Sequence, residues 1–145
     1  MSLFDKLQGH RNDKLKAEKE AGEKFLEQNK TRAGVNELPG GIQYEVIKEG
    51  NGPKPVLANR IKAHYKGCLL NGREFDSSYK RNQPFTAGLT QLIKGWQQAI
   101  PLMPVGSIWR LWIPSDLAYG DRGAGGDIPG GATLQFDIEL LEIVG

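Results

Sequence analysis

The sequence predicts an α+β protein, in which a charged N-terminal helix precedes one domain built on an antiparallel β-sheet. Residues 3–33 lack proline and are rich in Lys, Glu, Ala and Leu, a composition typical of a solvated helix. In the rest of the chain only residues 91–103 have helical character. Apolar and polar side chains alternate, as in strands with one buried face, over residues 42–47, 60–70, 107–113 and 133–143. We therefore place the helix in residues 1–34 and the domain in residues 35–145.

Length and charge limit the classes of function. At 145 residues the chain holds one hydrophobic core, since domains commonly contain about 100–150 residues. Residues 1–34 carry 8 Lys or Arg against 6 Asp or Glu, and residues 35–145 carry 11 of each. A domain with balanced charge has no electrostatic reason to bind nucleic acid, so we expect no nucleic-acid partner.

The single cysteine, Cys68, forms no intramolecular disulfide, which favours a reducing compartment. The N-terminus lacks the apolar run of a signal peptide, and no stretch approaches the ~18 apolar residues of a membrane span. We therefore expect no membrane partner and, if the chain is complete, a cytoplasmic location. A fragment that has lost a targeting segment would look the same.

The predicted N-terminal helix has a thin apolar stripe. Ala17, Ala21 and Phe25 repeat every four residues, Gly22 interrupts the run, and charges fill most other positions. Gly34 stands where a glycine commonly ends a helix. Such a stripe buries too little area for a stable coiled coil, so we expect a monomer or at most a weak dimer.

The predicted strands follow a turn at residues 38–41. Within residues 60–70, alternation places Tyr65 on the inward face and His64 on the outward face. The dipeptide Asn71-Gly72 then marks a tight hairpin turn into residues 73–76.

The helix expected in residues 91–103 is short, because Pro101 marks its end. In the strand that follows, Trp109 belongs to the inward face, while Trp112 lies on the outward face, where we expect it to be exposed. An exposed Trp112 would mark a place for the N-terminal helix or a partner to dock. In the last strand Phe136 points inward.

The sequence gives no support for a phosphate-binding loop, a calcium loop, or a catalytic histidine or cysteine. Residues 118–132 form a long loop with six glycines, but they miss the G-x-G-x-x-G spacing and no helix follows to bind phosphate. Asp121 and Asp127 lack the ligand spacing of a calcium loop. His64 fits a hydrogen-bonded structural histidine better than a general base, and Cys68 fits a packing role better than a reactive thiol.

Six aromatic residues come from separate elements and are set beside an acid and a base. Core packing is the plain interpretation of such aromatics. Two of them carry hydroxyls that need partners when buried, and Asp76 and Arg81 are suitable partners. The aromatics are Tyr65, Phe75, Phe85, Trp96, Tyr119 and Phe136.

Ordered motifs across residues 40–144 resemble those of the FKBP-type peptidyl-prolyl cis-trans isomerases. The motifs are "HYKG" (64–67), "NGREFDSSYKRNQPF" (71–85), "LIKGW" (92–96), "MPVGSIWRLWIPSDLAYG" (103–120) and "IPGGATLQFDIELLEI" (128–143). The junction at residues 25–50 is similar to that of the bacterial macrophage-infectivity-potentiator branch, in which a long helix precedes the isomerase domain. Most of the N-terminal part that dimerises in that branch is missing from this sequence.

The resemblance implies a half-wrapped antiparallel β-sheet around one short α-helix, with a pocket that needs no metal or cofactor. It implies that the catalytic residues are Tyr65, Phe75, Asp76, Trp96, Tyr119 and Phe136. The substrate-binding residues that it implies are Arg81, Phe85, Leu92, Ile93 and Ile128.

The function implied is isomerisation of Xaa-Pro peptide bonds in proline-containing peptides and unfolded proteins. Rapamycin-type macrolides are candidate inhibitors, although Ala124 and Asp127 stand where familiar members offer a His and an aliphatic residue to ligands. One alternative is a proline-segment binding or chaperone module with incidental turnover. Another is an interaction scaffold led by the N-terminal helix.

Overall fold

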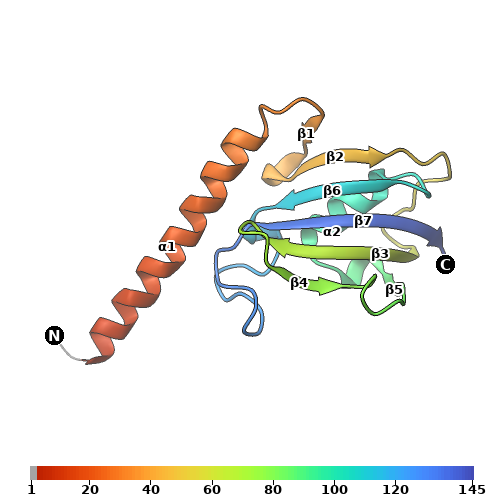
Figure 1. Cartoon of the computed structure of the whole chain (residues 1–145). Helices are drawn as coiled ribbons and strands as arrows, with labels where there is room; N and C mark the ends of the chain where they lie inside the picture. Colours follow the sequence, from red (N-terminus) through yellow and green to blue (C-terminus); the bar gives the residue numbers. More distant parts are fainter. Residues whose placement is uncertain (1–2) are drawn as a thin grey trace.

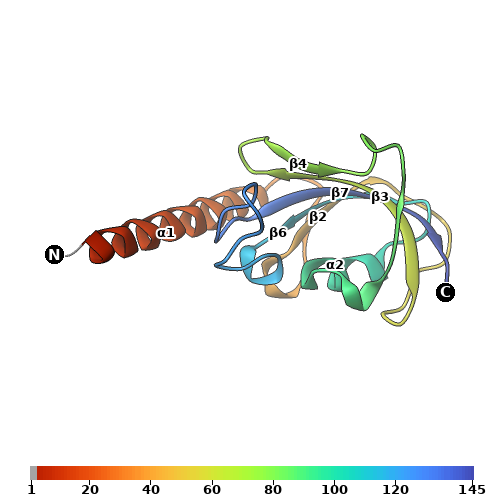
Figure 2. The same ribbon diagram turned by 90° about the horizontal axis from the view of Figure 1, so that it is seen from below.

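A computed structural model describes the backbone of residues 3–145. In the N-terminal helix it describes the side chains from Asp13 onward. The chain forms one seven-stranded antiparallel sheet, a long N-terminal helix and a short helix inside the curve of the sheet (Figures 1 and 2). The helices are α1 (Leu3–Asn29) and α2 (Lys94–Ala99). The strands are β1 (Val35–Glu37), β2 (Gln43–Lys48), β3 (Arg60–Leu69), β4 (Glu74–Ser77), β5 (Phe85–Gly88), β6 (Ile108–Ile113) and β7 (Leu134–Ile143).

The strand order is β1-β2-β6-β7-β3-β4, and β5 pairs with β3 beside β4. Strands β3 and β7 form the longest ladder, in which Tyr65 lies opposite Ile138 and Gly67 opposite Phe136. The strands predicted from alternation are therefore confirmed, and so is the turn after β3, where Gly72 has a φ of +92°. The short strands β1 and β5 were not predicted, because three or four residues carry too little alternation.

The core lies between the concave face of the sheet and α2. Inward residues of β3, β6 and β7, such as Ile61, Leu111 and Ile138, are fully buried there. Gly95 lets α2 sit close to the sheet, because a Cβ atom at this position would lie 2.5 Å from Ile113 Cγ2. The helix is as short as predicted, since a 3₁₀ turn that contains Pro101 follows it.

Helix α1 ends at Asn29, earlier than the predicted end at Gly34. Backbone hydrogen bonds between residues three apart replace the helical pattern, from Thr31 N–H to Gln28 C=O and from Arg32 N–H to Asn29 C=O. The amide of Asn29 is buried and donates to Gln43 Oε1 at 2.8 Å. Gly34 instead takes its positive φ of +88° in the turn before β1.

The face that α1 turns to the domain differs from the predicted apolar stripe. Ala17 and Ala21 are exposed, whereas Gly22 and Asn29 are buried. Gly22 makes a close approach, because a Cβ atom there would lie 2.2 Å from Thr133 Oγ1. Phe25 of that stripe does contact the domain, at Trp112, but small and polar residues form much of the remaining contact, and a search for apolar periodicity does not detect them.

Trp112 is buried, not exposed as predicted, with 2% of its surface accessible. It lies on the outer face, opposite to Trp109 as expected, but α1 covers it. The ring of Phe25 lies 6.4 Å from it, and the Arg32 guanidinium lies 5.4 Å from the ring centroid. Its indole N–H donates to Gln135 Oε1 at 3.0 Å. Trp112 is therefore the docking point of the N-terminal helix.

Of the helices in residues 3–145, none has the length and apolar character needed to cross a membrane.

Candidate functional site

A cavity of about 310 Å³ opens between the start of α2, strands β3 to β5, strand β7 and the loop that follows β6. This volume lies at the lower end of the range of small-molecule pockets, which is about 300–1,000 Å³. The lining residues are Tyr65, Phe75, Asp76, Phe85, Gln91, Leu92, Ile93, Trp96, Tyr119 and Phe136. Nine of these ten were predicted as site residues, and Gln91 was missed.

Trp96 forms the floor of this cavity. It lies in the first turn of α2 and is 5% exposed. The rings of Tyr65 and Phe136 meet it edge-on, at centroid distances of 5.3 and 5.1 Å, and Phe85 lies 5.7 Å away. Because neighbouring aromatic rings hold its plane in place, Trp96 offers a fixed flat surface to a ligand.

Gly67 makes the opposite wall possible. Phe75 and Phe136 meet at right angles, 5.7 Å apart, over the β3 backbone. A Cβ atom at Gly67 would lie 2.6 Å from the Phe75 ring and 2.9 Å from the Phe136 ring. The sequence pattern predicts for Gly67 only a place within a strand. A glycine inside a strand is itself a signal of close approach, and it could have marked this position.

The polar side of the cavity is a hydrogen-bonded cluster of three side chains. The Tyr65 hydroxyl donates to Asp76 Oδ2, and Arg81 Nη1 donates to Asp76 Oδ1. Arg81 Nη2 also donates to the Tyr65 hydroxyl oxygen at 3.1 Å. The backbone N–H of Ser77 donates to Asp76 Oδ1 at 2.9 Å. Asp76 therefore accepts three hydrogen bonds and ties β4 to β3 and to the Arg81 segment.

This environment keeps Asp76 ionised. Partial burial opposes the charge, but the hydrogen bonds from Tyr65 and Arg81 and the positive charge of Arg81 outweigh it, so the pKa of the carboxyl lies below its usual range. Burial, assisted by the hydrogen bond to Asp76, raises the pKa of the Tyr65 hydroxyl. Tyr65 thus remains a proton donor, and neither group changes protonation near neutral pH.

Three donors at the cavity have no protein acceptor among residues 13–145, and one of them is the buried indole N–H of Trp96. Tyr119 lines the cavity, is 40% exposed and makes no side-chain hydrogen bond with a described residue. Its pKa is raised by burial and by the charge of Asp76, so its hydroxyl keeps its proton. The backbone N–H of Ile93, just before α2, is likewise without an acceptor, whereas the Leu92 carbonyl already accepts from Gln97 Nε2 at 2.8 Å.

Two predicted substrate-binding residues do not line the cavity. Arg81 lies behind Asp76 and Tyr65, with its guanidinium 5.7 Å from the Tyr65 ring centroid. Ile128 is 7% exposed and pairs with Ala124 within the glycine-rich loop. Ile128 therefore differs from the prediction, because its side chain is packed into the core.

The residues for which the sequence favoured no catalytic or metal-binding role lie away from the cavity. His64 Nδ1 is 2.8 Å from Ser78 Oγ, and its ring stacks on Tyr79 at 4.6 Å. Cys68 is buried, which raises the pKa of its thiol. Asp127 forms an exposed ion pair with Arg73 at 3.4 Å. Within the described part of the chain, no group of three His, Cys, Asp or Glu side chains is placed to hold a metal ion.

Comparison with known proteins covers both parts of the chain. Residues 52–141 match the family described as FKBP-type peptidyl-prolyl cis-trans isomerase, and residues 1–46 match the domain amino terminal to FKBP-type peptidyl-prolyl isomerase.

Two curated relatives span nearly the whole chain. The FKBP-type 22 kDa peptidyl-prolyl cis-trans isomerase of Escherichia coli is 43% identical over 98% of this chain and 69% of its own length. Outer membrane protein MIP of Legionella longbeachae is 40% identical over 97% of this chain and 60% of its own length. The chain thus spans about two thirds of these relatives.

A solved structure shares the fold. The crystal structure of a peptidyl-prolyl cis-trans isomerase from Pseudomonas syringae superposes with a TM-score of 0.84 at 40% identity, covering 90% of this chain and 96% of that one.

Proposed function

Because this chain belongs to the FKBP-type peptidyl-prolyl cis-trans isomerases, we propose that its aromatic cavity catalyses rotation about the peptide bond that precedes proline. The observation that supports this site most directly is the floor of the cavity. Trp96 offers a flat apolar surface in a space of about 310 Å³, which suits a prolyl ring. Tyr119 and the Ile93 N–H supply unused donors at its edge.

The reaction makes and breaks no covalent bond. Unaided rotation is slow because it disrupts amide resonance against a barrier of about 18–20 kcal/mol. A twisted amide has lost this resonance, and its carbonyl oxygen carries less charge than in the planar form. A water-poor aromatic cavity therefore disfavours the planar amide more than the twisted one. Only such a difference between ground state and transition state accelerates the reaction.

Each group of the cavity has a role in this scheme. Trp96 holds the prolyl ring, Tyr119 donates its hydroxyl to a substrate carbonyl, and the Ile93 N–H fixes the chain beyond the proline. Asp76 orients Tyr65 and Arg81 and so holds the cavity wall in place. With its pKa below the usual range, Asp76 does not exchange protons during turnover at neutral pH.

Assistance to protein folding is the use that we propose for this activity, since uncatalysed proline isomerisation limits folding for tens to hundreds of seconds. Unfolded proteins would be the natural substrates, and holding them without turnover is the rival function. We further propose that rapamycin-type macrolides enter the cavity, although Ala124 and Asp127 do not line it and so add no contacts from the glycine-rich loop. The cytoplasmic location stays a prediction from the sequence.

The test is protease-coupled isomerisation of a Leu-Pro peptide, with and without rapamycin. We expect activity in the wild type and a clear loss in Trp96→Ala, with Lys24→Ala, an exposed helix position, as the matched control. Binding of a proline peptide without acceleration of its isomerisation would favour the holding module over the enzyme.

A further inference from the structure

The loop that carries Tyr119 is rich in glycine and is held within itself by a few backbone hydrogen bonds. It runs from the end of β6 to the start of β7, and six of the residues between 118 and 132 are glycines. Gly131 N–H donates to Gly120 C=O at 2.9 Å across its two stems, Ala124 and Ile128 exchange two backbone hydrogen bonds further out, and Gly123 N–H donates to Tyr119 C=O at 3.2 Å. These bonds fix the backbone near Tyr119, but six glycines leave the loop few side chains with which to pack. The position of Tyr119 over the cavity therefore depends on what the loop packs against.

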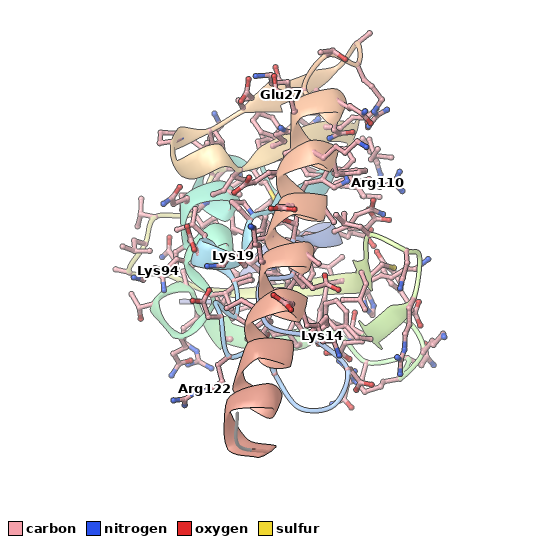
Figure 3. The ribbon with its side chains drawn as sticks, turned by 90° about the vertical axis from the view of Figure 1, so that its left-hand side faces the viewer. Lys14, Lys19, Glu27, Lys94, Arg110 and Arg122 are labelled. Carbon is pink, nitrogen blue, oxygen red and sulfur yellow. The ribbon has the colours of Figure 1, made fainter. Side chains whose placement is uncertain are left out.

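Helix α1 packs against both stems of this loop. On the outgoing stem, Lys19 Nζ lies 2.7 Å from Asp121 Oδ1, two residues after Tyr119. On the returning stem, a Cβ atom at Gly131 would lie 3.0 Å from both Leu15 Cδ1 and Lys19 Cγ. Figure 3 shows α1 lying across the front of the domain, with Lys19 on the part that passes the loop.

Further along α1 the helix is held firmly to the sheet. Gly22 approaches Thr133, and the Leu26 carbonyl accepts a hydrogen bond from Gln43 Nε2 at 2.8 Å. Trp112 packs beneath Phe25. The segment that contains Leu15 and Lys19 thus extends from a fixed base over the loop stems, which is the arrangement of a brace.

We propose that α1 positions the Tyr119 hydroxyl for catalysis by bracing the glycine-rich loop, with Leu15 and Lys19 as positioning residues. The proposal rests on the isomerase function proposed above. Loss of the brace would leave the cavity walls on β3, β4 and α2 intact but spread Tyr119 over several positions. The fraction of molecules with the donor correctly placed would then fall, and kcat/KM with it.

Activity provides the first test, in the full chain. The double variant Leu15→Ala/Lys19→Ala should lower kcat/KM about two- to fivefold, in the range of exposed contacts. Lys24→Ala, which removes an exposed lysine of the same helix, should leave it unchanged. In a Tyr119→Phe background the double substitution should have no further effect, because the hydroxyl on which it acts is gone. An equal loss in both backgrounds would overturn the proposal, since a general structural role gives additive losses.

A second readout needs no turnover. The chain has four tyrosines, so 3-fluorotyrosine labelling gives four ¹⁹F resonances, and Tyr119→Phe identifies that of Tyr119. The Leu15→Ala/Lys19→Ala double variant should shift or broaden this resonance, and Lys24→Ala should not. An unchanged Tyr119 resonance in a folded double variant would refute the brace even if the wild type proved to be no isomerase.

Exchanging the two charges of the ion pair distinguishes loss of this contact from unfolding of the variant. Lys19→Asp alone should place like charges beside Asp121 and disturb the Tyr119 resonance, and Lys19→Asp/Asp121→Lys should restore it. Failure of the exchange to restore the resonance, with both variants folded, would contradict the role of this ion pair.

Discussion

Asp76→Ala separates a structural role of this carboxylate from a chemical one. The substitution removes the acceptor of three donors, the Tyr65 hydroxyl, the Arg81 guanidinium and the Ser77 N–H. A buried donor left without its partner costs about 1–3 kcal/mol of stability. Here the carboxylate is 38% exposed and the Arg81 side chain 50% exposed, so water replaces part of what is lost. We therefore expect a loss of about 1–2 kcal/mol, with most of it arising at Tyr65.

For a chain of this length such a loss lowers the melting temperature by about 3–8 °C, measurable by circular dichroism. Only part of it should reappear in the activation barrier, so kcat/KM should fall by about tenfold or less, since each 1.36 kcal/mol is a factor of ten. Tyr119→Phe should spare stability more, because the Tyr119 hydroxyl has no acceptor among the described residues.

The pH dependence follows from the lowered pKa of Asp76. A carboxyl whose pKa is lower in the folded than in the unfolded state contributes stability above its unfolded pKa, about 3.9, and loses it as pH falls through the folded value. Asp76 thus stays ionised from about pH 6 to 8, and the pH–rate profile should be flat there. A fully stable Asp76→Ala with a thousandfold loss of activity would mean that the carboxylate acts on the rotating bond and would exclude a purely structural role for it.

Four further outcomes are expected. Trp112→Ser should cost about 3–5 kcal/mol in urea unfolding, as should Trp109→Ser, because α1 buries the Trp112 ring that the sequence placed on an exposed face. A much smaller loss would mean that α1 undocks readily. Gly67→Ala should push a methyl into Phe75 and Phe136, lowering stability by about 1–3 kcal/mol and kcat/KM with it, and unchanged values would refute that contact. Leu-Pro peptides should turn over faster than Glu-Pro peptides, because the aromatic lining would have to desolvate a carboxylate; equal rates would contradict this. Sedimentation should show a monomer or weak dimer, and a dimer at low micromolar concentration would exclude it.

Much of the site could be predicted from the chain because its residues come in ordered motifs. The sequence predicts nine of the ten lining residues, and the inward direction of Tyr65 and Phe136 follows from strand parity alone. Gln91 was missed because a surface glutamine beside a short helix carries no local signal. Ile128 was assigned to the pocket by resemblance, but the loop turns its side chain into the core.

Alternation along a strand determines which face a side chain takes, because successive Cβ atoms point to opposite sides of the sheet. It placed Trp109 and Trp112 on opposite faces correctly. It does not determine what covers a face, and burial of Trp112 was decided only by the docking of α1. The pattern of apolar residues also does not reveal where two elements approach each other most closely. Gly22 and Gly67 matter because they lack a side chain where another element packs, and only the tertiary structure shows which atoms occupy that space.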